Sequence, residues 1–318
     1  MLAVLALGLA FGAIAAHRHF CTMGALSDYF LFQSTRRLRG LVAATATAMA
    51  GTSFLALAGL PVFGDGTVTL PWLAAVLGPL AFGAGMTLSG GCITRNLVRA
   101  GQGSLKAGLT LVVTSLATLV TTAGILAGPA AWLRSWSSTV ALPPDLLAPA
   151  GLLIAAAAAA WILVPAKQRI RARTDIVTGA ALGALVPLWH VLVQTRPWPV
   201  MPSFVLPNAD LLAALAAGES GWAGALFAAG TIGGAALMGL VRRSHRFEGF
   251  VDGADLKRHV LGALLMGAGG GLIGICSFGM AVSGFAALLP VAIVGTLAMA
   301  AGCRQTLRVL EGRGLFSR

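Results

Sequence analysis

LGPLAFGAGMTLSGGC, at Leu77–Cys92, is the most informative stretch of this chain, because its pattern returns as LGALLMGAGGGLIGIC at Leu261–Cys276. Both copies read L-G-x-L-x-x-G-x-G-x-x-L-x-G-x-C, and with a shared alanine, nine positions match at identical offsets. Glycine and leucine are common in an apolar chain, so a few matches would mean little. Nine matches in register, ending on a rare cysteine, indicate an internal duplication.

The composition around these copies is that of a membrane protein. Of the 318 residues, 57% are hydrophobic and only 10% charged, and the mean hydropathy is +0.87. Soluble domains carry about 25% charged residues. Apolar segments long enough to span a bilayer occur at about 1–17, 40–60, 71–91, 105–128, 149–165, 175–195, 221–241, 260–276 and 286–302. We therefore expect an all-α polytopic membrane protein with about nine transmembrane helices, the first of them retained rather than cleaved as a signal peptide.

The basic residues predict the orientation of these segments. Although the net charge is +12, the Lys and Arg residues form no single patch of the kind that binds nucleic acid. Nineteen of the 22 lie in five clusters, at 36–39, 95–106, 167–173, 242–258 and 304–318, whereas the loops near 61–70, 129–148 and 196–220 are rich in Pro and Trp. The positive-inside rule then places the N-terminus outside and the C-terminus in the cytoplasm.

With this orientation, the two copies of the glycine and cysteine pattern cross the membrane in opposite directions. We expect a single transporter domain, residues 1–318, with an inverted pseudo-two-fold repeat whose halves cover about 1–165 and 175–318. Transporters built from inverted repeats place the substrate site near the midplane, between interrupted helices.

Short helical pieces follow three of the four cysteines. TMGALSDYFLFQ follows Cys21, ITRNLVRAGQ follows Cys92 and SFGMAVSG follows Cys276. Each is too short to span a bilayer, and irregular backbone within a membrane has to be buried in protein or line a cavity. We expect three short re-entrant helices that begin at these cysteines.

These helix starts have the chemistry of an anion site. Unpaired N–H groups and the helix dipole favour an anion without a fixed charge, and a thiol adds a weak donor and a polarizable sulfur. Gly90, Gly91 and Gly274 would let backbone or ligand approach closely. The combination suits a soft, sulfur-containing anion. The chain contains no C-x-x-C pair that would suggest a metal site, and its four cysteines are too few to suggest a disulfide framework.

Each of these residues also has a structural interpretation. A cysteine in a membrane helix is often a small packing residue, and small-x-x-x-small patterns often mean close helix packing. The shared repeat position favours a functional role for Cys92 and Cys276, the alternatives stay open for Cys21, and Cys303 is expected to be packing. Possible accessory residues are Arg95, which could equally be an ordinary loop charge, Thr22 and Ser277.

Several of these motifs resemble the YeeE/YedE family of bacterial inner-membrane proteins, which includes thiosulfate transporters. The resemblance covers the whole chain in segment count and cysteine order, and it is carried by the G-G-C of Gly90–Cys92, the R-x-F-C of Arg18–Cys21 and the block at 246–284. One departure is Ile275, where the family has glycine before the cysteine; Gly279 matches the later glycine.

The resemblance implies an hourglass-shaped inner-membrane protein that imports thiosulfate by relaying it between cysteine thiols. Carried over by motif, the relay would be Cys21, Cys92 and Cys276, with Gly90, Gly91 and Gly274 beside them. It also implies a cytoplasmic sulfurtransferase of the TusA-like type as a possible partner, besides membrane lipid.

We therefore expect a permease without cofactor, not an enzyme, for thiosulfate or a related sulfur anion. No ATP-binding loop is present in the sequence. The alternatives are a membrane sulfurtransferase with a persulfidated cysteine, a transporter of another sulfur or selenium species, and a scaffold without a transported ligand.

Overall fold

The computed structural model describes residues 1–312, apart from 19, 61, 64–66, 142, 165–168, 194–201, 218–221 and 246. Lys167, Arg246, Arg313 and Arg318 of the basic clusters lie outside the described residues.

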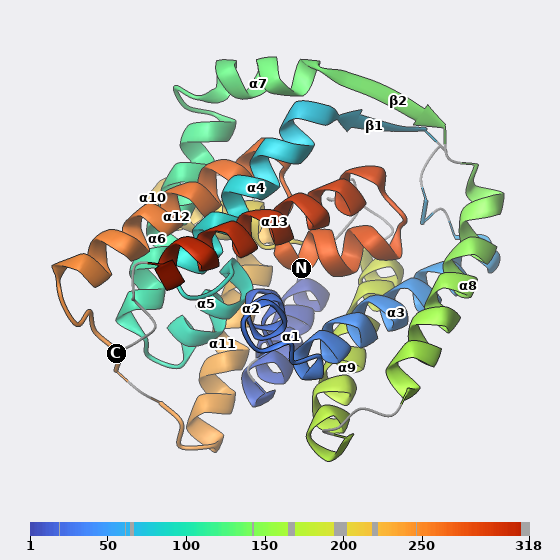
Figure 1. Ribbon diagram of the computed structural model, residues 1–318, viewed down its shortest axis with the longest axis horizontal. Helices are drawn as coiled ribbons and strands as arrows, with labels where there is room; N and C mark the ends of the chain where they lie inside the picture. Colours follow the sequence, from blue (N-terminus) through green and yellow to red (C-terminus); the bar gives the residue numbers. More distant parts are fainter. Residues whose placement is uncertain are drawn as a thin grey trace.

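Helices dominate the fold (Figure 1). They are α1 (Leu2–Arg18), α2 (Thr22–Phe32), α3 (Arg36–Leu57), α4 (Trp72–Leu88), α5 (Ile93–Gly101), α6 (Leu105–Thr122), α7 (Ala127–Ser135), α8 (Pro144–Leu163), α9 (Arg169–Val193), α10 (Val205–Ala217), α11 (Trp222–Val241), α12 (Gly253–Ile273), the π-helical η1 (Gly279–Gly284) and α13 (Pro290–Gly312), with two strands, β1 (Thr67–Pro71) and β2 (Ser137–Ala141).

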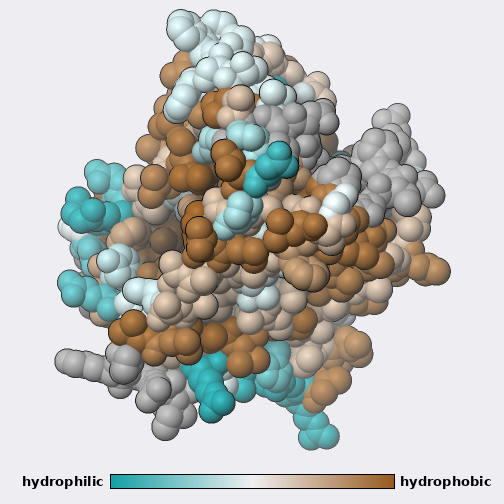
Figure 2. Space-filling view, turned by 90° about the vertical axis from the view of Figure 1, so that its right-hand side faces the viewer, coloured by the Kyte–Doolittle hydropathy of each residue, from teal (hydrophilic) through white to brown (hydrophobic). Residues whose placement is uncertain are grey.

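The all-α polytopic class is confirmed. Seven helical segments of the described chain are long and apolar enough to cross a membrane, and one of them joins α1 to α2 while another joins α4 to α5. α12 and α13 are not among the seven. The count of nine crossings therefore stays a prediction. Figure 2 shows apolar side chains over much of one face, with hydrophilic groups gathered at its margins.

The two copies of the repeated pattern pack against each other as α4 and α12, and glycines form the contact. A Cβ added at Gly85 would lie 2.5 Å from the Gly262 carbonyl oxygen, and one added at Gly78 would lie 2.7 Å from the Gly269 carbonyl oxygen. Each pair joins the first glycine of one copy to the third glycine of the other. Such reciprocal contacts are what a two-fold axis generates, and they agree with the inverted repeat, which remains a prediction.

The local sequence accounts for both ends of α12. The Asp252 carboxylate caps its start by accepting the Asp255 N–H at 2.7 Å, a common role for aspartate at a helix N-terminus. The helix ends at Gly274, whose φ of +69° is the left-handed conformation that glycine adopts without strain. The chain then turns into Cys276.

On one side of the molecule, ion pairs join segments at or next to the basic clusters in two separate pairs. Arg36 pairs with Asp175 at 2.6 Å, and Arg99 pairs with Glu248 at 2.6 Å. At the other side, β1 and β2 pair two of the Pro- and Trp-rich loops into an antiparallel ribbon. Figure 1 shows this ribbon and α7 at the opposite end of the molecule from the start of α9 and the end of α11. We call the side with the Arg pairs the basic face.

Candidate thiol site at three short helices

Three cysteines occupy the N-cap positions of three short helices, as the sequence predicts. Cys21 caps α2, and its sulfur accepts the Gly24 N–H at 3.3 Å. Cys276 precedes the helical turn that contains η1, and its sulfur accepts the Gly279 N–H at 3.3 Å. At Cys92, the cap of α5, the contact from the Arg95 N–H is looser. Because the sulfurs of Cys21 and Cys276 accept an N–H of their own helices, their S–H protons are left to point elsewhere.

The thiols of Cys21 and Cys92 lie next to each other. Ser277, the residue after Cys276, brings its hydroxyl beside the Cys92 thiol. Cys303 lies in the neighbourhood of Cys21, and its thiol is next to Thr87. All four cysteines are free and buried. The tertiary structure thus brings together three helix starts that are far apart in sequence.

Residues 202–204, which precede α10, close over Cys276. They were not among the site residues expected from the sequence. The Phe204 N–H donates to the Cys276 sulfur at 3.3 Å, and the Cys276 N–H donates to Ser203 Oγ at 3.0 Å. Ser283 Oγ donates to the Pro202 carbonyl at 3.0 Å and holds the segment in place. The Pro-Ser pair before an apolar run is the one sequence signal for a helix start at this position.

The glycines before the cysteines serve mainly the backbone conformation. Gly90 and Gly274 have φ values of +67° and +69°, and a Cβ added at Gly90 would meet nothing within 4 Å. Gly90 and Gly274 therefore matter more for the left-handed turn, a backbone conformation that most side chains disfavour, than for the expected close approach of backbone or ligand. Gly91 is tighter, because an added Cβ would lie 2.9 Å from Cδ of Arg95.

Two polar side chains fix the turn before Cys92 through a single carbonyl. Ser89 Oγ donates to the Gly91 carbonyl at 3.2 Å, and Asn96 Nδ2 donates to the same oxygen at 3.1 Å. Ser89 Oγ also lies 2.9 Å from the Gly85 carbonyl, so the turn is anchored to α4. Neither side chain was a candidate from the sequence.

Several buried polar atoms near Cys92 have no well-formed hydrogen bond within the described chain. They are Thr94 Oγ1, Arg95 Nε, Asn96 Oδ1 and Ser277 Oγ. Leaving a buried donor or acceptor unpaired costs about 1–3 kcal/mol, so such atoms in one place indicate a polar ligand or water. Of the three accessory candidates, Arg95 and Ser277 belong to this group, while Thr22 is buried directly after Cys21.

An aromatic cluster flanks the Cys276 end of the site. The Phe11 ring lies 4.8 Å from that of Phe204 and 5.0 Å from that of Phe278, and Phe204 stacks on Phe227 at 4.8 Å. Phe204 and Phe278 belong to the two segments that hold the Cys276 sulfur. These rings exclude water from the thiol, which strengthens electrostatic contacts made there.

At the other end, Cys21 borders a small cavity of about 20 Å³ on the side of the basic face. The residues that line this cavity are Arg18, Phe20, Cys21, Arg37, Gly40, Asp175 and Thr178. We call it the neck. The site therefore runs from Cys276, under the segment before α10, past Ser277 and Cys92, to Cys21 and the neck.

Comparison with known proteins places this geometry in a family. The family model described as sulphur transport matches residues 17–304. The thiosulfate transporter TsuA of Escherichia coli (strain K12) is 24% identical over 298 residues, which cover 86% of this chain and 84% of the relative. Since the matched region contains all four cysteines and nearly every helix, the chain belongs to the sulphur transport family.

Proposed function

We propose that this protein imports thiosulfate, or a related small sulfur anion, by passing it between the thiols of Cys276, Cys92 and Cys21. The observation that carries the proposal is the position of three buried thiols at the starts of three short helices, with those of Cys21 and Cys92 next to each other. TsuA, the thiosulfate transporter to which the chain is similar, supports the choice of substrate.

The helix starts supply attraction for an anion without binding it tightly. Partial positive charge at three helix N-termini favours an anion, and three arginines in their place would hold it too strongly for release. The unpaired Ser277 and Thr94 hydroxyls would donate to the oxygens of the ion, while the cysteine S–H groups would face its terminal sulfur. Conduction requires several weak sites in series rather than one strong site.

The positive-inside rule supports an orientation of the chain that is compatible with import. If the basic face is cytoplasmic, with the N-terminus outside and the C-terminus inside, Cys276 is the outer thiol and Cys21 the inner one, and the bacterial inner membrane is the location. A TusA-like sulfurtransferase at the basic face would then be a suitable cytoplasmic acceptor.

The test is uptake of radiolabelled thiosulfate by cells that lack other sulfur importers. We expect Cys92→Ser and Cys276→Ser each to lower the initial rate at least about tenfold, because serine keeps a donor but loses the large polarizable sulfur. Cys303→Ser is the matched control, since Cys303 is equally buried but caps no helix. Normal uptake in both variants, with normal protein levels, would refute the proposal.

The same cells separate transport from sulfur transfer. Mass spectrometry of the three thiols after thiosulfate exposure should show unmodified cysteines if the ion passes intact. A stable persulfide on one of them would support the membrane sulfurtransferase instead. Selenite and sulfite as competitors would show whether another sulfur or selenium species is the preferred substrate.

A further inference from the structure

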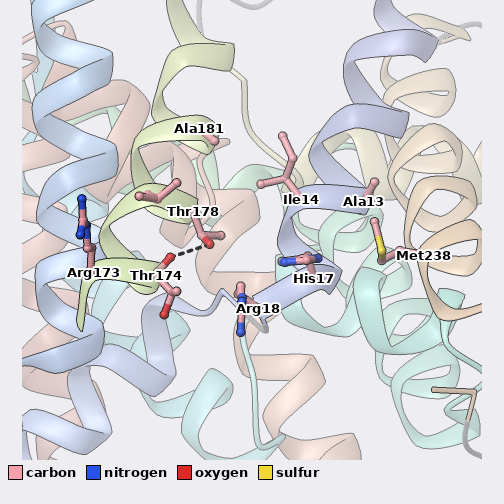
Figure 3. A pocket seen from close by; sticks show the side chains of 10 residues that line it. Ala13, Ile14, His17, Arg18, Arg173, Thr174, Thr178, Ala181 and Met238 are labelled. Carbon is pink, nitrogen blue, oxygen red and sulfur yellow. Dashed lines mark hydrogen bonds between the residues drawn. The ribbon is translucent and has the colours of Figure 1, made fainter. Parts of the chain in front are cut away.

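A second, larger cavity opens next to the neck. It measures about 500 Å³ and lies between the end of α1, the first half of α9 and α11 (Figure 3). Its walls carry Ile14, Val177 and Met238, and its rim carries His17 and Arg18. A volume of this size can hold a small ligand.

The cavity and the neck share two residues, Arg18 and Thr178. The cavity is therefore the approach to Cys21 from the basic face. With about 20 Å³, the neck has space for roughly one water molecule. A sulfur oxyanion is larger, so it has more room in the cavity than in the neck.

The charges around the neck leave one cation available. Asp175 pairs with Arg36 at 2.6 Å, and Asp28 pairs with Arg37 at 3.4 Å. Arg18 is exposed and makes no ion pair or hydrogen bond with the described residues, and it lies where the cavity meets the neck. On the rim, His17 contacts Arg242 at 3.1 Å, which adds a second positive charge.

We propose that this cavity is an anion vestibule, in which Arg18 holds the transported sulfur anion at the entrance of the neck. This inference rests on the proposed function and adds to it a site outside the thiol relay. Arg173 and Thr178 also line the cavity, but most of its exposed wall is apolar, so the ion is attracted mainly by charge. Weak holding of this kind is what a transport path requires at its end.

Charge-selective labelling tests the vestibule without measuring transport. Val177 lines the cavity and is 62% exposed, so Val177→Cys is a suitable reporter for methanethiosulfonate reagents of opposite charge. We expect the anionic reagent to react about fivefold faster than the cationic one, relative to their rates with a free thiol. Adding Arg18→Gln should lower this preference by more than half, whereas Arg18→Lys should keep it.

Two controls sharpen the result. The unsubstituted protein, whose four thiols are buried, gives the background labelling, and Arg134→Gln, on α7 beside the β-ribbon, removes a charge far from the cavity. Equal rates for the two reagents, or a preference that is undiminished in Arg18→Gln, would overturn the inference.

Further measurements distinguish the ligand and the two proposals. An anionic phospholipid that stays bound in native mass spectrometry, and is lost in Arg18→Gln, would assign the cavity to a lipid headgroup and overturn the inference. If the intact protein takes up no thiosulfate, the proposed function fails, and so does a vestibule for that ion. If it does take up thiosulfate and Arg18→Gln leaves the rate unchanged, only the vestibule is refuted.

Discussion

At the scale of single residues, the site depends on backbone conformation as much as on thiols. Gly90 and Gly274 occupy equivalent positions of the two copies and share a left-handed φ. Each turn directs the chain from a long helix into a cysteine that caps a short one. The thiol is therefore placed by the glycine two residues before it.

Gly90→Ala should disturb this placement although the space around Gly90 is open. A left-handed φ costs a residue with a Cβ about 1–2 kcal/mol, and asparagine tolerates it better than alanine. We expect a lower thermal unfolding temperature in detergent and slower thiosulfate uptake, with Gly90→Asn affected less than Gly90→Ala despite its larger side chain. Gly128→Ala, in open space without a positive φ, is the control. A larger effect of asparagine would show that space, not conformation, limits this position.

At the scale of helices, the crossing of α4 and α12 sets the distance between the two halves of the site. Glycines at the crossing let the backbones approach closely, as small residues do between membrane helices. Cys92 and Cys276 each lie just beyond the end of one of these helices. A wider crossing would move the two helix starts relative to each other.

Gly85→Ala is expected to widen the crossing. The added methyl group would lie 2.5 Å from the Gly262 carbonyl oxygen and 2.6 Å from the Met266 nitrogen, both of which are backbone atoms. Overpacking of this kind costs about 1–3 kcal/mol, measurable as a lower midpoint of thermal unfolding. Gly108→Ala, on α6 in open space, should be neutral or slightly stabilising. Equal unfolding midpoints for the two variants would contradict the close crossing.

At the scale of the whole molecule, contacts across the basic face join segments that are distant in sequence. Glu248, in the loop between α11 and α12, pairs with Arg99 at the end of α5. The Arg99 guanidinium holds the pKa of Glu248 below its ordinary value of 4.5. This pair anchors the short helix that begins at Cys92 to the second half of the chain.

Glu248→Gln should therefore cost stability in a manner that depends on pH. Because the folded-state pKa is lowered, the contribution of Glu248 is present above its ordinary pKa and disappears as the pH falls through the lowered value. With 43% of the Glu248 side chain exposed, the contribution is about 0.2–1 kcal/mol at neutral pH. The unfolding midpoints of the wild type and Glu248→Gln should differ at pH 7 and converge in acid. A constant difference would exclude the ion pair as the cause.

The sequence by itself determined the membrane class and the cysteine at the start of each short helix. These features are local, because hydropathy, glycine turns and helix caps depend on residues close together in the chain. The family resemblance also followed from short motifs around Cys21, Cys92 and Cys276, and the family match agrees with it. What Gly90 and Gly274 do, however, became clear only from their φ values.

The tertiary structure alone decided which thiols meet and what surrounds them. The proximity of Cys21 to Cys92, the closure of Ser203 and Phe204 over Cys276, and the vestibule at Arg18 all join segments separated by tens of residues or more. No local pattern specifies such contacts, because they depend on how apolar helix faces pack against one another. The order of the three thiols is for this reason a property of the fold.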